Sequence, residues 1–111
     1  MIVTFPIKTV SEANTRQHWR MKYNRKKAQQ QAFVPIWRNA KVKVELPCQI
    51  IFTRYSTHLL DSDNLVSAFK ATRDALAREI GIDDGSSQIE WIYRQARIPK
   101  REHYFTVEVK Q

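Results

Sequence analysis

The sequence predicts a single α+β domain in the order β-α-β-α-β-β, with a small mixed sheet and two helices packed on one of its faces. Three observations lead to this fold class. With 111 residues there is room for one domain and one modest core, and no repeat, low-complexity run or linker divides residues 1–111. Short β-rich stretches alternate with two longer helical stretches. An apolar fraction of 42% with only two glycines is typical of a compact globular chain.

The first half of the chain is expected to form a strand, a helix and a second strand. Residues Ile2 to Ile7 are β-rich and form the first strand. A helix is expected from about Thr15 to Val34, and Pro35 should end or kink it because proline lacks a backbone donor. Leu46 to Tyr55 is expected to form a buried strand. Four helix side chains fall roughly on one face: Trp19, Tyr23, Gln30 and Phe33.

A second helix is expected to begin at Asp61 or Ser62 and to reach about Ile80. A side-chain oxygen at its start can accept hydrogen bonds from the free amides of the first turn. Gly81 follows as a natural C-terminal stop, because glycine readily adopts the left-handed conformation found there. The inward-facing stripe of this helix is expected to consist of Leu65, Phe69, Thr72, Leu76 and Ile80.

Two strands are expected to complete the domain, one over residues 88–97 and one over residues 103–110. We expect them to form a hairpin joined through residues 99–101. Alternation is clean in the last strand, which predicts one buried and one exposed face. The side chains predicted to share the buried face are Phe105, Val107 and Val109.

Charge is unevenly distributed in this chain, whose net charge is +8. Residues 13–44 contain no acidic residue but nine lysines and arginines, whereas residues 59–90 contain seven of the eleven acids. A basic half attracts polyanions, with an affinity that falls steeply as salt rises. The alternative is a solvated basic helix, although the paired glutamates that such helices usually show are absent here.

Targeting signals and cysteine chemistry give little further direction. The N-terminus lacks a basic start followed by an apolar run, and no apolar stretch approaches the ~20 residues needed to span a bilayer. Cys48 is the single cysteine, so it cannot form an internal disulfide or a zinc pattern. We therefore expect a cytoplasmic protein that does not associate with membranes.

Four aspartates stand at the two ends of the second predicted helix. Asp61 and Asp63 flank its start, and Asp83 and Asp84 follow its end. If the strands bring the second pair beside the first, two to four carboxylates converge. Hard oxygen ligands suit Mg²⁺ or Mn²⁺, which can polarise a phosphoryl group and activate a bound water. Lys70 lies two helical turns after Asp63 and is a candidate phosphate clamp.

Each of these motifs also has an ordinary structural explanation. Asp61-Ser62-Asp63 can simply cap a helix and interact with its dipole. Asp83-Asp84-Gly85 can be a common turn, and Lys70 can be a solvent-facing lysine. Their pairing across one helix is more specific than either motif alone.

The motif residues together resemble the signature of RusA-like endodeoxyribonucleases, a family of Holliday junction resolvases common in phages and prophages. The matching runs are Asp61-x-Asp63-Asn64-Leu65, then Lys70-Ala71-x-x-Asp74-Ala75-Leu76, then Gly81-x-x-Asp84 with Asp83 before it. The general resemblance covers most of the chain, and its specific motifs occupy residues 61–84. One departure is that the family's lysine falls where this chain has Ser67, so that the lysine element comes three residues later.

The resemblance implies that Asp61, Asp63 and Asp84, with Asp83 assisting, hold Mg²⁺ or Mn²⁺. It also implies a catalytic role for Lys70 and a homodimer that places two active sites on branched double-stranded DNA, a symmetry that fits a four-way junction. Arg16, Arg20, Arg25 and Lys26 are candidate phosphate contacts, because basic residues position a protein on DNA without reading its sequence. Trp19 and Tyr23, which basic residues surround, are candidates for stacking on unpaired bases.

The sequence therefore favours a metal-dependent endodeoxyribonuclease that resolves Holliday junctions in recombination and repair. Two other classes of function stay open. One is a catalytically silent nucleic-acid-binding module on the same fold, which the displaced lysine suggests. The other is a phage accessory protein whose acidic loops bind a partner protein.

Overall fold

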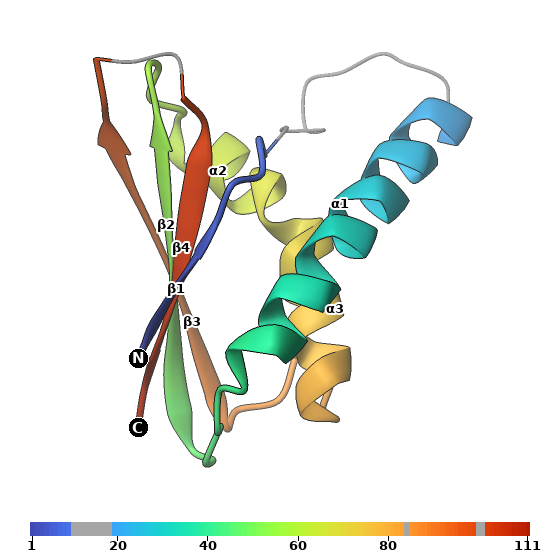
Figure 1. Cartoon of the computed structure of the whole chain (residues 1–111), viewed down its shortest axis with the longest axis vertical. Helices are drawn as coiled ribbons and strands as arrows, with labels where there is room; N and C mark the ends of the chain where they lie inside the picture. The colour runs from blue at the N-terminus through green and yellow to red at the C-terminus, as the bar shows by residue number, and fades with distance from the viewer. Residues whose placement is uncertain (10–18, 84, 100–101) are drawn as a thin grey trace.

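The computed structural model describes residues 1–9, 19–83, 85–99 and 102–111. Within this part of the chain, four strands and three helices form a single α+β domain, and all the helices lie on one side of the sheet (Figure 1). The expected order β-α-β-α-β-β is confirmed, with the second helix divided in two. The elements are β1 (Ile2–Phe5), α1 (Trp19–Ala40), β2 (Cys48–Ser56), α2 (Ser62–Ala68), α3 (Lys70–Ile80), β3 (Ile89–Arg97) and β4 (Tyr104–Lys110).

The sheet is mixed and has the strand order β1-β4-β2-β3. Strand β4 runs antiparallel to both β1 and β2, whereas β3 runs parallel to β2. The expected hairpin of residues 88–97 and 103–110 is therefore wrong, because β2 lies between these two strands. An interior position gives β4 neighbours on both sides, and its apolar stripe is buried. The buried residues of that stripe are Phe105, Val107 and Val109, as predicted.

All five phenylalanines of the chain lie in the core, each with 0% of its surface exposed. Phe5 of β1 stacks on Phe33 of α1 at 4.6 Å and on Phe105 of β4 at 5.0 Å between ring centroids. Phe52 of β2 stacks on Phe69, between α2 and α3, at 4.9 Å. The rings thus join elements that are distant in sequence, and burying one such side chain contributes roughly 1.5–3 kcal/mol.

Helix α1 continues past Pro35 to Ala40, so it does not end where the sequence pattern places its end. Phe33 and Trp37, which flank the proline, are both buried and stack with 6.2 Å between ring centroids. This packing keeps the segment helical although the proline nitrogen cannot donate a hydrogen bond. Phe33 is fully buried, whereas Tyr23, a candidate for base stacking, has 56% of its surface exposed.

The second predicted helix is interrupted at Phe69, whose backbone has φ −99° and ψ 0°. Its ring enters the core, and its carbonyl accepts from the buried Thr72 hydroxyl at 3.0 Å and from the Arg73 amide at 2.8 Å. These bonds start α3 directly after the break. Gly81 ends α3 with φ 87°, which confirms the predicted stop.

Candidate metal site and nucleic-acid interface

Asp61 is the N-cap of α2 and lies beyond the C-terminal end of β2. Its Oδ1 accepts hydrogen bonds from the backbone nitrogen of Asn64 at 3.0 Å and from Asn64 Nδ2 at 2.8 Å. Both Asp61 and Asp63 are exposed, and Asp63 stands in the first turn of the helix. The capping explanation for Asp61 is thus confirmed, with Oδ1 as the capping oxygen.

Two polar side chains of the sheet fix the loop that carries Asp61. Gln95 of β3 donates to the Leu60 carbonyl at 2.6 Å and accepts from the Leu60 amide at 2.9 Å. Arg54 of β2 donates from Nη1 to the carbonyl of His58 at 2.7 Å, and burial lowers the pKa of this guanidinium. The sequence pattern identified neither residue, because a polar residue on the buried face of a strand is recognisable only when the pairing of that strand is known.

Asp83 lies at the other end of the helical segment, past the C-terminus of α3. Because β2 and β3 are parallel, the connection between them leaves the sheet at the C-terminal end of β2 and returns to the N-terminal end of β3, at the opposite end of the sheet (Figure 1). The eleven residues of α3 alone span about 16 Å at 1.5 Å per residue. Asp83 therefore does not join Asp61 and Asp63 within one chain; its Oδ1 accepts from the Gly85 amide at 2.9 Å, as in the ordinary turn considered above.

No three side chains of His, Cys, Asp or Glu in the described residues lie close enough together to hold a metal ion. The predicted convergence of Asp83 on the first carboxylate pair is not found there. Asp84, the other predicted ligand of the second pair, lies outside the described residues. The candidate metal site of the described chain thus consists of Asp61 and Asp63.

Lys70 is the exposed first residue of α3 and lies on the side of that helix that faces α1. It lines a hollow of about 220 Å³ together with Lys22, Tyr23 and Lys26 of α1 and Ser67 of α2. The break at Phe69 separates the helical register of Lys70 from that of Asp63. Ser67, which follows Asp63 by four residues within α2, lies on the same face of that helix as Asp63.

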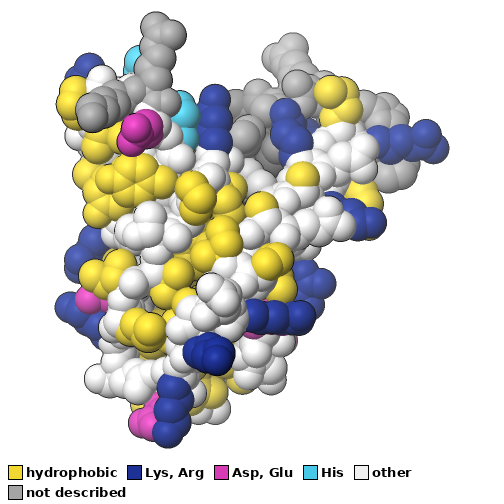
Figure 2. Space-filling model, in the orientation of Figure 1, with side chains coloured by type: hydrophobic (Ala, Val, Ile, Leu, Met, Phe, Trp, Pro, Cys, Tyr) yellow, Lys and Arg dark blue, Asp and Glu magenta, His cyan; other side chains and the backbone are white. Residues whose placement is uncertain are grey.

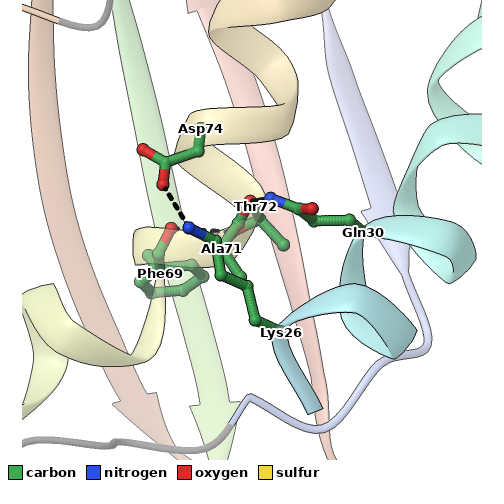
Figure 3. Close-up of polar contacts among 6 residues, drawn as sticks. All are labelled: Lys26, Gln30, Phe69, Ala71, Thr72 and Asp74. Atoms are coloured by element: carbon green, nitrogen blue, oxygen red, sulfur yellow. Dashed lines mark hydrogen bonds and ion pairs between the residues drawn. The ribbon is translucent and has the colours of Figure 1, made fainter. Parts of the chain in front are cut away.

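The residues of α1 that are predicted to contact nucleic acid differ from one another in exposure and in their partners. Lys26 reaches across to Asp74 of α3, with 3.0 Å between Nζ and Oδ2 (Figure 3). Tyr23 and Arg20 are exposed, and Arg25 is half-buried. Arg16 and the side chain of Trp19 lie outside what the structure describes. Figure 2 shows Lys and Arg side chains spaced along the length of α1.

A second ion pair joins the C-terminal parts of α1 and α3. Arg38 donates from Nε to Glu79 at 2.6 Å and from Nη2 to its other carboxylate oxygen at 3.0 Å. The hydrogen bond from Arg38 and the nearby positive charge of Arg78 lower the pKa of the Glu79 carboxyl. Because this pair is bidentate, it holds the two helices in one alignment.

Comparison with known proteins yields no match: no protein-family model, no curated protein and no solved structure is significantly similar to this chain. None of the described helices combines the length and the apolar character that crossing a bilayer requires.

Proposed function

We propose that this protein is a cytoplasmic, metal-dependent endodeoxyribonuclease that acts on branched DNA. One observation carries the proposal: two exposed carboxylates, Asp61 at the end of a fixed loop and Asp63 in the first turn of α2, stand beside a basic helical surface in a chain of net charge +8. The two carboxylates suit a divalent cation, and the basic surface suits the phosphodiester that the cation would polarise.

The donor set fits Mg²⁺ or Mn²⁺. Mg²⁺ commonly keeps several waters and binds through one or two carboxylates plus phosphate oxygens, so Asp61 and Asp63 suffice as the protein ligands. When bound, such an ion would stabilise charge on the phosphate and lower the pKa of a bound water. Asn64 holds Asp61 through its side-chain amide and thereby orients the carboxylate. Lys70 would bind a phosphate next to the site.

A homodimer is part of the proposal. Asp83, the described member of the second carboxylate pair, follows α3 at the opposite end of the sheet from Asp61 and Asp63. A two-fold partner could present its own second pair to the first pair of this chain, and symmetry would then create two such sites. Mixing Asp63→Asn protein with Asp84→Asn protein tests this, because only mixed dimers would contain one intact composite site.

The decisive experiment is cleavage of a synthetic four-way junction in Mg²⁺ or Mn²⁺. Wild type is compared with Asp63→Asn and with Glu45→Gln, a matched loss of one exposed carboxylate far from α2. We expect symmetric nicks from wild type and from Glu45→Gln, none from Asp63→Asn, and none from wild type in chelator. Cleavage by Asp63→Asn at the wild-type rate would refute the proposed site.

A nucleic-acid-binding module without catalysis is the second candidate. It is favoured by the lack of a group of three potential metal ligands among the described residues. Such a module would bind the junction equally well in chelator and in Mg²⁺ and would leave it uncut. Failure to bind any DNA at moderate salt would instead point to the accessory protein whose acidic loops contact another protein.

A further inference from the structure

A continuous groove follows the line along which α1 packs against α3. Its central part has a volume of about 620 Å³ and is lined by residues of both helices, among them Tyr23 and Lys27 of α1 and Arg78 of α3. The hollow that contains Lys70 and Ser67 shares Tyr23 and Lys26 with this part and extends the groove toward α2. The groove is therefore longer than either hollow alone.

Small side chains on α3 explain why the groove exists. Ala71 and Ala77 are buried between the helices, so α1 approaches closely and long side chains stand only along the rims. Gln30 of α1 closes the floor by donating from Nε2 to the Ala71 carbonyl at 3.0 Å (Figure 3). Packed helix axes lie about 8–10 Å apart, which leaves too little width for a duplex to enter.

The charges along the groove are unbalanced in favour of cations. Its carboxylate at position 74 is already neutralised by Lys26, with 3.0 Å between Nζ and Oδ2. The remaining carboxylate that lines it, Asp83, lies at the end away from α2. Four cations line the groove without an ion pair in the described part of the chain: Lys22, Lys27, Lys70 and Arg78.

Tyr23 stands among these cations with 56% of its surface exposed. An exposed aromatic ring beside several lysines offers a base a stacking surface while its phosphates meet the positive charges. A base can stack on such a ring only when it is unpaired. We propose that the α1/α3 groove binds a single strand of DNA, with Tyr23 stacking on a base and Lys22, Lys27, Lys70 and Arg78 contacting the phosphates.

This inference rests on the proposed action on DNA and adds a path for one strand. Ser67 lines the α2 end of the groove, and Asp63 lies one turn before it on the same helical face. A strand in the groove therefore leads toward Asp61 and Asp63. An unpaired strand next to a cleavage site is what a branch point in DNA supplies and what a regular duplex lacks.

Binding of a fluorescein-labelled oligothymidylate, followed by anisotropy in chelator, tests the proposal. We expect wild type to bind the single strand more tightly than a duplex of equal length. Tyr23→Ala should weaken binding about 5- to 150-fold, the range of base–aromatic stacking, whereas Tyr23→Phe should stay within about threefold. Lys27→Glu with Arg78→Glu should reduce the slope of log K against log salt by about 1.4, or about 0.7 for each contact.

Lys110→Glu is the matched control for the single substitution Lys27→Glu, since it also reverses one charge, at the exposed end of β4 and outside the groove. It should leave the salt slope almost unchanged. Equal losses in Lys110→Glu and Lys27→Glu, or tight duplex binding that does not depend on Tyr23, would overturn the proposal. Because this assay measures binding in chelator and the junction assay measures cleavage, failure of the groove and failure of the proposed cleavage are separate results.

Discussion

Asp61 has one role that the structure shows and one that we propose, and two substitutions separate them. The carboxylate caps α2 by accepting two hydrogen bonds from Asn64, at 3.0 Å and 2.8 Å. It is also a proposed metal ligand. Asp61→Asn keeps a side-chain oxygen that can accept the same bonds but removes the negative charge. Asp61→Ala removes both the acceptor and the charge.

The two substitutions should differ in stability by about 1 kcal/mol. Loss of a capping side chain costs about 0.5–2 kcal/mol, and asparagine caps as well as aspartate does. Replacement by asparagine loses only the charge–dipole interaction, about 0.3–1 kcal/mol at an exposed helix end. Leu65 and Ala68 anchor the seven residues of α2 in the core, so alanine should not unfold the helix.

Urea unfolding followed by circular dichroism measures the stability, and cleavage of the four-way junction in Mg²⁺ measures activity. We expect both variants to lose cleavage, but only Asp61→Ala to lose about 1 kcal/mol or more. Cleavage by Asp61→Asn at the wild-type rate would show that the charge at this position is not needed and would remove Asp61 from the metal site. Equal destabilisation by both substitutions would refute the capping argument instead.

Three further predictions concern the fold. Gly81→Ala should cost about 1–2 kcal/mol in urea unfolding because of φ 87° alone, since a Cβ there meets no atom within 4 Å, whereas Gly85→Ala, without positive φ, should be nearly neutral. Arg38 lowers the pKa of Glu79, so the pair stabilises the fold above the unfolded pKa of that carboxyl. The stability difference between wild type and Arg38→Met should therefore be lost as pH falls through the lowered pKa of Glu79 in the folded state. Burial raises the pKa of the Cys48 thiol, so Ellman's reagent should modify it slowly until urea unfolds the chain.

Contrary results would be equally informative for these three. A stable Gly81→Ala would mean that the end of α3 relaxes to another conformation. A pH-independent effect of Arg38→Met would assign the loss to packing of the arginine side chain. Rapid modification of native Cys48 would show that the start of β2 opens frequently.

Local sequence features determined most of the individual elements. Period-two alternation identified the buried face of β4, and Gly81 marked the end of α3, because both depend on the backbone preferences of neighbouring residues. The capping role of Asp61 was likewise readable, since a cap acts on the amides of the next turn. The excess of basic residues in α1 and the two carboxylates at the start of α2 were also recognisable from the sequence alone.

Tertiary structure alone decided which elements meet. The strand order placed β4 between β1 and β2. Because β2 and β3 are parallel, Asp83 lies at the opposite end of the sheet from Asp61. The sequence pattern missed Lys27 and Arg78 because they become neighbours only when α1 packs on α3. Helix and strand periods describe the faces of one element, whereas the choice of partner depends on burying apolar surface from elements far apart in the chain, as Phe33 and Phe105 do here.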